Sequence, residues 1–541
     1  MEPMEALMHR RIPVRALLFV VAASCALLLI LPGQTVTTRY LNDLFVILDG
    51  AYRVVSGQVP SRDFHTPLGP LAYYLPAAGY ALSGTLGGAM PAAMALAILA
   101  FSVPLLHILG SRLHPVLALL FGVFLLLILA VPINLGEGIT ALSFAKFYNR
   151  IGWIALSILI IMYLRPIRMQ EQQDLLDTLC ATGLALVMIY TKLTYGIAAV
   201  AFLIFMLTDR HQRRWVVATL GLLVITCIAV EIIWQSSRAY LDDLRLALNV
   251  GGRLRGTWGQ ITDHILGNLT DYVLLTIFAG LALARTRSMR DGLFYLFCAL
   301  AGFLIINQNF QVWGIIILHA ASAVAAETIL RFEDKDVANP IERHWSIRGG
   351  TKLLFLALVL PTIVHCTAAL GLHMISASIR AGQSIALPHL EQVRVANLWT
   401  WGEYDTAHLY LTTLRDGAKL LSEMNMDDEK IFVLDLANPF PMILNTPPPK
   451  GDMPWLQWER TLNTSAFIPA GTLMTDVTIM MEPKPIGDAT QPEPDSEGLK
   501  ALYGSYIADH FEIARETDHW KVYRRRPQPS PGAFLNHMGS S

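Results

Sequence analysis

Charged residues are scarce in this sequence. Only 15% of its 541 residues are Asp, Glu, Lys or Arg, whereas 54% are hydrophobic, and soluble domains carry about 25% charged residues. The deficit is concentrated before residue 375, where apolar runs recur that are long enough to cross the roughly 30 Å hydrocarbon core of a bilayer. The composition therefore excludes a soluble globular protein and predicts a polytopic α-helical membrane protein.

The sequence also lacks a cysteine framework and an excess of positive charge. Its five cysteines all lie in apolar segments, and none forms a CxxC pair. We therefore expect packing residues rather than disulfides or a cysteine metal site. The formal net charge of −1 argues against nucleic acid as a partner, because no basic face is visible. HExxH, P-loop and GxSxG motifs in a suitable context are missing as well.

Eleven apolar segments are predicted to span the membrane, chosen by their length and lack of charge. They are 16–33, 88–110, 115–133, 151–164, 176–191, 196–208, 215–235, 271–284, 291–306, 311–329 and 352–372. Segment 68–84 is apolar but short, and it contains Pro70 and Pro76. We expect it to form a juxtamembrane or re-entrant helix.

The positions of the basic residues support this count. The clusters are Arg10-Arg11, Arg112 with His114, Arg165 with Arg168, Arg210 to Arg214, Arg285 to Arg290, and Arg331 to Arg348. Lys and Arg collect in cytoplasmic loops, and eleven spans place all these clusters on one side. A twelfth span at 68–84 would divide them between the two sides. The pattern predicts a cytoplasmic N-terminus and outer positions for 34–87, 134–150, 236–270 and everything after 373.

The composition becomes that of a soluble domain near residue 385. Short β-like runs occur at 431–436, 477–481, 511–514 and 520–523, and helical patterns occur at 404–424 and 497–510. We predict a transmembrane domain over 1–384, a small extracytoplasmic α/β domain over 385–525 and a disordered tail over 526–541.

The first outer loop, 34–87, concentrates ionisable residues between apolar segments, where such groups cost energy and indicate function. Asp43 lies in an amphipathic stretch, and a carboxylate at the membrane surface can act as a general base toward a hydroxyl group. A solvated surface acid is the alternative. Prolines stiffen the turn that holds Asp63 and His65, although an Asp side chain capping the turn explains Asp63 equally well. With Asp49 also present, the cluster favours a functional role.

This loop resembles a known superfamily. An acidic residue after the first span, then a Gly-x-x-Pro-x-x-Asp-Phe turn and a Pro-Leu-x-x-Tyr-rich helix, is similar to the GT-C polytopic glycosyltransferases. These use lipid-phosphate-linked sugars, and they include the protein O-mannosyltransferases and the aminoarabinose transferase of lipid A. The resemblance is close in the first outer loop and architectural elsewhere. The acidic motif, often Asp-Glu or Asp-Asp, is Asn42-Asp43 here, and the Lys-Pro-Pro of some members is His65-Thr66-Pro67. The role of a second acid, with Asp63 as the candidate, stays open.

The resemblance implies a polyprenyl-phosphate sugar donor, a base at Asp43 and a leaving lipid phosphate. The developing phosphate charge needs cationic or hydrogen-bonding partners near the outer ends of spans. The candidates for substrate binding are Asp49, His65, Tyr148, Asn149, Arg150, Lys192, Tyr195, Arg253 and Arg255. Interfacial anchoring is the alternative for the Tyr, Lys and Arg side chains. No cofactor is certain. A divalent metal ion could assist, but the sequence contains no decisive ligand set.

We therefore expect an integral membrane glycosyltransferase that acts on an extracytoplasmic glycan, lipid or protein acceptor, in a bacterial inner membrane with a periplasmic C-terminal domain. The alternative is a transporter or flippase of lipid-linked or small solutes. Transporters show paired repeats and polar breaks in helices at the bilayer midplane. This chain instead places its unusual polar groups in outer loops and ends in a large outer domain, which transport does not require.

Overall fold

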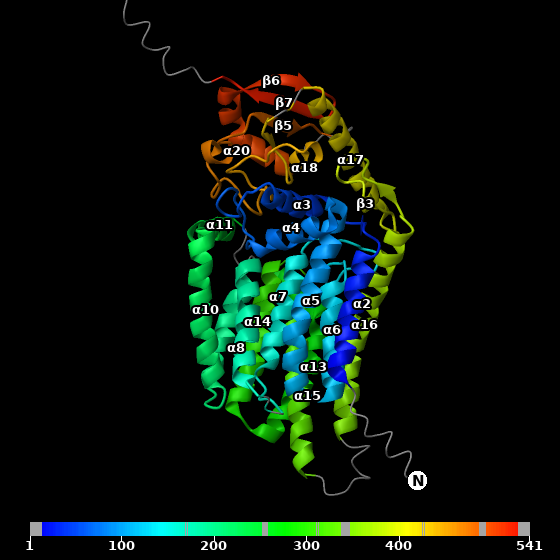
Figure 1. Ribbon diagram of the computed structural model, residues 1–541, viewed down its shortest axis with the longest axis vertical. Coiled ribbons are helices and arrows are strands. Elements are labelled where there is room, and N and C mark those ends of the chain that lie inside the picture. Colours follow the sequence, from blue (N-terminus) through cyan, green and yellow to red (C-terminus); the bar gives the residue numbers. More distant parts are fainter. Residues whose placement is uncertain are drawn as a thin grey trace, which may run out of the picture.

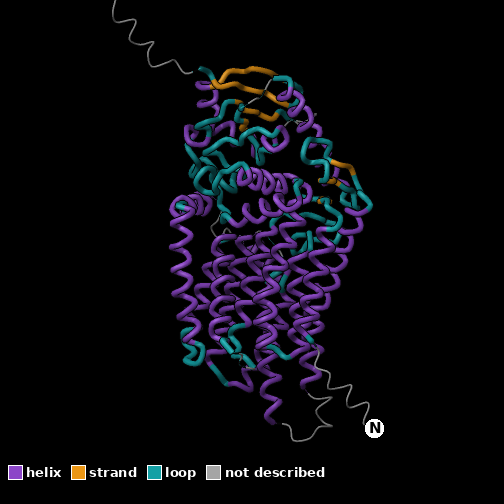
Figure 2. The backbone as a smooth tube through the Cα atoms, viewed as in Figure 1, coloured by secondary structure: helices purple, strands orange, loops and turns teal. Residues whose placement is uncertain are grey.

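A bundle of long helices carries a smaller α/β region at one end (Figures 1 and 2). The computed structural model describes residues 13–167, 169, 171–250, 258–309, 311, 313–336, 347–424, 426, 428–485 and 494–527. Of the predicted disordered tail, residues 528–541 lie outside this described part.

All eleven segments predicted to span the membrane overlap helices. These helices are α2 (Val14–Ile30), α5 (Leu86–Arg112), α6 (Pro115–Ala130), α7 (Phe147–Ile161), α8 (Gln173–Thr191), α9 (Leu193–Met206), α10 (Arg213–Trp234), α13 (Leu269–Thr286), α14 (Met289–Asn309), α15 (Ile316–Asp336) and α16 (Ile347–Ser378). Within the described chain, six of them (α5, α8, α10, α13, α14 and α16) are long and apolar enough to cross a membrane, and α2, α6, α7 and α9 are shorter apolar helices. The chain is an integral membrane protein, and the count of eleven crossings stays a prediction.

Two helices of the first loop lie across one end of the bundle rather than along it (Figure 1). They are α3 (Leu41–Val55), which is amphipathic, and α4 (Leu71–Ser83), which contains Pro76 and ends at Gly84 with φ 70°. The two helices approach closely at Gly50, where an added Cβ atom would lie only 2.0 Å from the Tyr73 ring. Segment 68–84 is thus a short helix against the bundle end, as expected.

A small sheet joins the first loop to the chain that follows the bundle. Its order is β1-β3-β2, from Thr35–Thr37, Val393–Val395 and Gln383–Ser384, and β1 pairs with β3 in parallel. Residues 35–37 and 393–395 therefore lie at the same end of the bundle, which we call the loop end. Residues 379–527 are called the C-terminal region.

The C-terminal region contains a four-stranded sheet in the order β4-β5-β7-β6. The strands are β4 (Ile431–Val433), β5 (Ile479–Pro483), β6 (Phe511–Glu516) and β7 (Trp520–Arg525), and the helices are α17 (Trp401–Ser422), α18 (Phe440–Leu444), α19 (Ala470–Leu473) and α20 (Pro494–His510). The four β-like runs and two helical patterns expected from the sequence are confirmed. Alternate residues face two cores: Ile431 and Val433 join the core shared with the bundle, whereas Phe432 packs into a separate core under α20.

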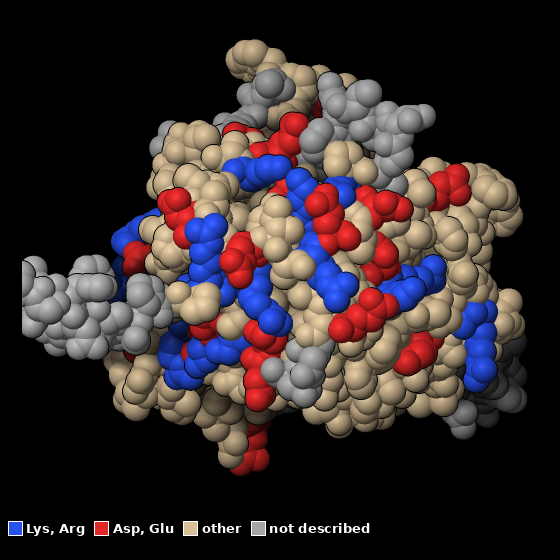
Figure 3. Space-filling view, turned by 90° about the horizontal axis from the view of Figure 1, so that it is seen from above, with Lys and Arg blue, Asp and Glu red and all other residues tan. Residues whose placement is uncertain are grey.

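The opposite end of the bundle, which we call the turn end, gathers basic residues from separate turns. Arg112 ends α5 and Arg165 follows α7, and the Arg331 guanidinium on α15 donates to the backbone carbonyls of both, at 2.5 and 2.9 Å. Arg165 and Arg290 also share one carboxylate, that of Asp209. Arg112, Arg165, Arg290 and Arg331, from four of the predicted clusters, therefore lie at the same end of the bundle, whereas Arg10-Arg11 and Arg168 lie outside the described residues. On the exposed surface of the C-terminal region, by contrast, both signs of charge are interspersed (Figure 3).

We expect the loop end to face outside and the turn end to face the cytoplasm, since cationic loops stay inside. Ser83→Cys and Ser422→Cys should react with a membrane-impermeant maleimide in intact cells, whereas Thr208→Cys should react only after permeabilisation. All three positions are exposed, and the five native cysteines lie at buried or half-buried positions, which keeps background labelling low. Labelling of Thr208→Cys in intact cells would contradict this topology.

Candidate active site

Asp43 lies in the first turn of α3, at the loop end. The preceding residue that caps the helix, Tyr40, has a left-handed backbone (φ 57°), a conformation that costs a non-glycine residue of order 1–3 kcal/mol and clusters at functional sites. The Tyr40 hydroxyl donates to Glu137 Oε1 at 2.6 Å, which holds it in place. Burial raises the pKa of the Asp43 carboxyl above its ordinary value, and the nearby Lys146 and Arg460 partly oppose this effect. The side chain is thus a partly desolvated carboxylate among cations.

A cavity of about 410 Å³ opens beside Asp43, between the bundle, α3 and the C-terminal region. We call it the cationic cavity, because among the described residues that line it Lys146, Lys192 and Arg460 are basic and Asp43 alone is acidic. Its apolar lining includes Val46, Ile47, Leu68, Leu193, Leu244, Ala247 and Leu248. A mostly apolar cavity with a few convergent charges is suited to a lipid with an anionic headgroup.

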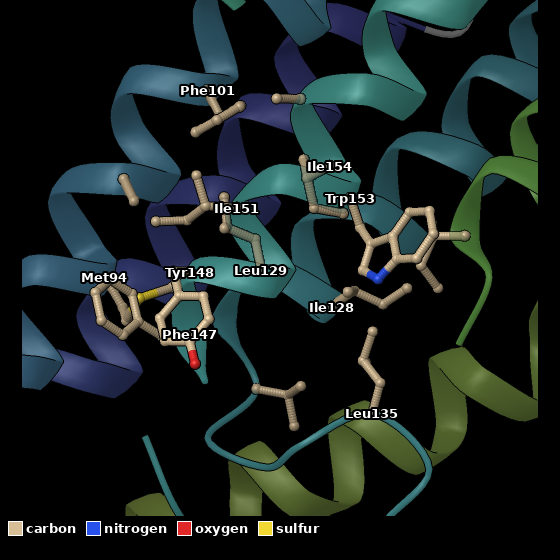
Figure 4. Packing of buried hydrophobic residues seen from close by; sticks show 14 of the residues in the cluster. Met94, Phe101, Ile128, Leu129, Leu135, Phe147, Tyr148, Ile151, Trp153 and Ile154 are labelled. Atoms are coloured by element: carbon tan, nitrogen blue, oxygen red, sulfur yellow. The ribbon is translucent and has the colours of Figure 1, made fainter. Parts of the chain in front are cut away.

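The lysines of the cationic cavity lie on aromatic rings. Lys146 Nζ is 4.9 Å from the Tyr40 ring centroid, and Lys192 Nζ is 5.5 Å from that of Tyr148. Lys192 Nζ also donates to Asn149 Oδ1 at 3.1 Å. Cation–π contacts and amide acceptors orient an ammonium without neutralising it. Tyr148 is itself fixed among buried hydrophobic residues of the bundle (Figure 4).

Three helix N-termini converge on the cationic cavity. Its lining includes residues from the first turns of α3, α7 and α9, and Lys146 and Lys192 are the residues that cap α7 and α9. A helix N-terminus carries about half a positive charge and unpaired N–H groups, and it attracts anions. Helix dipoles and cationic side chains therefore favour the same ligand, an anion beside Asp43.

A second cavity, of about 460 Å³, lies on another side of Asp43. We call it the polar cavity. It is lined by the start of α3, by α17 and by loops of the four-stranded sheet, and it shares Tyr40 and Asp43 with the cationic cavity. Its basic side chains, Arg39 and Lys484, are paired: Arg39 bridges Glu137 and Glu403, and Lys484 binds Glu516. Because its carboxylate borders both cavities, Asp43 can contact a molecule bound in one cavity while a second molecule is bound in the other.

Two predicted site residues of the first loop have structural partners instead. The Asp49 carboxylate is fully buried and accepts from Arg53 Nε at 3.0 Å. Asp63 caps its own turn by accepting from Val59 N–H at 2.8 Å and binds Lys450 at 3.1 Å. Although burial alone would raise the Asp63 pKa, these two contacts hold it below its ordinary value. Neither residue lines the two cavities, so the turn-capping alternative describes Asp63.

His65 is also engaged away from both cavities. Its Nδ1 is 2.6 Å from Asp243 Oδ1, and the other oxygen of that carboxylate accepts from Thr66 N–H at 3.0 Å. Asp243 belongs to α11 (Ser237–Val250), so this contact fastens the turn to the helix that follows α10.

The predicted phosphate ligands divide into two groups. Tyr148, Asn149 and Lys192 line the cationic cavity together with Asp43. Arg150 does not line it. Its side chain is buried in the bundle, where one guanidinium nitrogen donates to Ile133 O at 2.7 Å. Of the remaining candidates, Tyr195 is buried against Trp153 with ring centroids 5.3 Å apart, and Arg253 and Arg255 lie outside the described residues.

Sequence reasoning missed Lys146 and Arg460. Lys146 lies shortly before the predicted span at 151, and a lysine at that position is typical of an interfacial anchor. Arg460 belongs to the C-terminal region, and nothing local marks it. Gln308, from a polar cluster after an apolar segment, also lines the cavity and accepts from Thr194 Oγ1 at 2.6 Å. As for metals, the described residues contain no group of three or more His, Cys, Asp or Glu placed to hold an ion.

Neither a family model nor a curated protein matches the chain. Among solved structures, it is similar to ArnT from Cupriavidus metallidurans bound to undecaprenyl phosphate, with 12% identity and a TM-score of 0.47 over 95% of this chain and 99% of that one. It is also similar to the arabinofuranosyltransferase AftD from mycobacteria, with 13% identity and a TM-score of 0.44 over 96% of this chain and 40% of that one. At this level of similarity, residue roles rest on the geometry described above.

Proposed function

We propose that the protein is an integral membrane glycosyltransferase that moves a sugar from a polyprenyl-phosphate donor to an acceptor on the outer face of the membrane. The main support is the placement of Asp43 between the cationic cavity and the polar cavity. The first suits the headgroup of an anionic lipid, and the second suits an uncharged polar acceptor. The polyprenyl carrier follows from the resemblance of the first loop to lipid-phosphate-dependent glycosyltransferases.

In the proposed reaction, the acceptor hydroxyl oxygen bonds to the anomeric carbon of the sugar while the bond from that carbon to the phosphate oxygen breaks. The hydroxyl proton passes to the Asp43 carboxylate. The electron pair of the broken bond stays on the lipid phosphate, which leaves with one further negative charge. Lys146, Lys192 and the helix N-termini stabilise that charge. A single displacement of this kind inverts the anomeric centre.

The ionic pairing in the polar cavity supports an uncharged, hydroxyl-rich acceptor, such as a neutral glycan. Arg39 and Lys484 each bind a carboxylate already, and the lining adds hydroxyl and amide groups from Thr37, Thr38 and Asn42. A periplasmic location in a bacterial inner membrane is part of this proposal. No step of the proposed reaction is assigned to a metal ion.

Incubation of the purified protein with a polyprenyl-phosphate sugar and candidate acceptors tests the proposal directly. Release of polyprenyl phosphate together with a glycosylated acceptor is the expected result. A transporter or flippase would instead move the lipid-linked sugar across a vesicle membrane and leave the sugar–phosphate bond intact. Mass spectrometry of surface glycans in a deletion strain would then identify the sugar and the acceptor.

Lys192→Met is expected to weaken donor binding, because the ammonium faces the donor phosphate. Hydrogen bonds to charged groups contribute roughly 1.5–3 kcal/mol, so the KM for the donor should rise about ten- to a hundredfold while the KM for the acceptor stays near wild type. Lys419→Met, on the exposed face of α17, is a matched control. Equal effects of the two changes would contradict the assignment of Lys192.

The pH dependence of donor binding gives a second measure of Lys192. Burial, together with repulsion from Arg460 and Lys146, lowers the pKa of Lys192 to about 7. A lysine is charged below its pKa, so wild-type affinity for the donor should fall as the pH rises through this value. Lys192→Arg keeps the positive charge at every such pH, and it should flatten the dependence.

A further inference from the structure

The donor site includes one cation from outside the bundle. Arg460 belongs to the C-terminal region, yet its half-buried side chain lines the cationic cavity with Lys146, Lys192 and Asp43. The electrostatic influence of Arg460 reaches both Asp43 and Lys192. The cavity therefore has walls from two parts of the fold, and each wall brings positive charge.

The turn that carries Arg460 is held firmly by the C-terminal region. The Trp458 N–H donates to Asp495 Oδ1 at 2.9 Å, and the Trp458 indole packs so closely on α20 that a Cβ atom on Gly498 would lie 2.2 Å from it. Thr461 Oγ1 accepts from Gln457 N–H at 2.9 Å. The position of Arg460 over the cavity is thus set by the fold of the C-terminal region.

The Arg460 guanidinium lies on an aromatic face, with Cζ 5.7 Å from the Trp455 ring centroid. Such stacking orients the planar group, whose forked N–H geometry suits a bidentate contact with phosphate oxygens. Three cations face the single carboxylate of Asp43 in this cavity. This excess of positive charge suits a donor phosphodiester, which gains a second negative charge when it becomes the leaving phosphate.

We propose that Arg460 is a ligand of the donor phosphate, so that the C-terminal region completes a donor site begun by the bundle. The inference rests on the proposed function and assigns one ligand of the donor phosphate to the C-terminal region. Donor binding and seating of the C-terminal region on the bundle are then linked, because the cation leaves the cavity whenever that region moves away.

The test measures binding of undecaprenyl phosphate and of undecaprenol, the same lipid without the phosphate, to the purified full-length protein. Arg460→Ala should weaken phosphate binding about ten- to a hundredfold and leave undecaprenol binding unchanged. Arg460→Lys should lie between Arg460→Ala and wild type, since it keeps the charge without the bidentate geometry. Arg515→Ala, on the exposed edge strand β6, is the matched control and should bind both lipids as wild type does.

The outcomes separate this inference from the proposed function. If the wild type prefers undecaprenyl phosphate and Arg460→Ala keeps that preference in full, Arg460 is not a phosphate ligand and the glycosyltransferase proposal stands. If Arg460→Ala weakens both lipids equally, the residue supports the cavity wall, and the inference is again overturned. If the wild type itself does not distinguish the two lipids, the polyprenyl-phosphate donor fails first. Thermal unfolding of each variant confirms that it is folded.

Discussion

Asp43→Asn is expected to abolish sugar transfer in a protein that still folds and enters the membrane. The amide keeps the size of the side chain and cannot accept the acceptor proton. General-base catalysis typically contributes about 10²–10⁴-fold, so kcat should fall by about that factor while donor affinity changes little. Turnover with a purified lipid-linked donor measures the effect. Asp242→Asn, at an exposed position on the helix after α10, is the matched control.

The wild-type pH profile gives an independent view of the same carboxylate. Because only ionised Asp43 accepts a proton, the rate should fall on the acid side through the pKa of Asp43, which burial holds above the ordinary aspartate value. Near wild-type turnover of Asp43→Asn would remove Asp43 as the base.

Much of the bundle could be predicted because each membrane span is encoded by one contiguous stretch of the sequence. A run of apolar residues without charge marks each helix. The basic residues at the helix ends identify one end of the bundle, as the contacts of Arg331 with Arg112 and Arg165 illustrate. The alternation of Ile431, Phe432 and Val433 in β4 is an equally local signal. Pairing of β1 with β3 joins segments far apart in the sequence, and no local pattern encodes it.

The candidate site was predicted only in part for the same reason. Asn149 and Lys192 could be found because each stands at the end of an apolar segment, and Asp43 because it lies among the ionisable residues of the first outer loop. Asp49 attracted the same interpretation, yet its ionic partner is Arg53 within α3. The sequence alone does not distinguish an ionisable residue that binds a substrate from one that forms an ion pair within the protein. Arg460 shows the converse, since it reaches the cavity only through the fold of the C-terminal region.

The buried Arg53 is the second residue at which a large effect is expected. Its guanidinium donates to the Asp49 carboxylate, to both oxygens of Asp452 and to the carbonyl of Pro449, and all three charged side chains are at most 1% exposed. This network ties α3 to the proline-rich turn of the C-terminal region. Gln58 adds a hydrogen bond to the carbonyl of Pro448 at 2.8 Å. The helix that carries Asp43 and the region that carries Arg460 are therefore joined here.

Arg53→Met should destabilise the protein by about 3–5 kcal/mol, because it leaves two buried carboxylates without their counterion. Unfolding in detergent measures the loss, and limited proteolysis should show the C-terminal region released first. Arg245→Met removes an exposed Arg–Asp pair and should cost at most about 1 kcal/mol. Neutralising the whole network, as Asp49→Asn/Arg53→Met/Asp452→Asn, should restore much of the stability, since the desolvated charges are then gone. A loss for Arg53→Met as small as that for Arg245→Met would show that the network does not hold the two regions together.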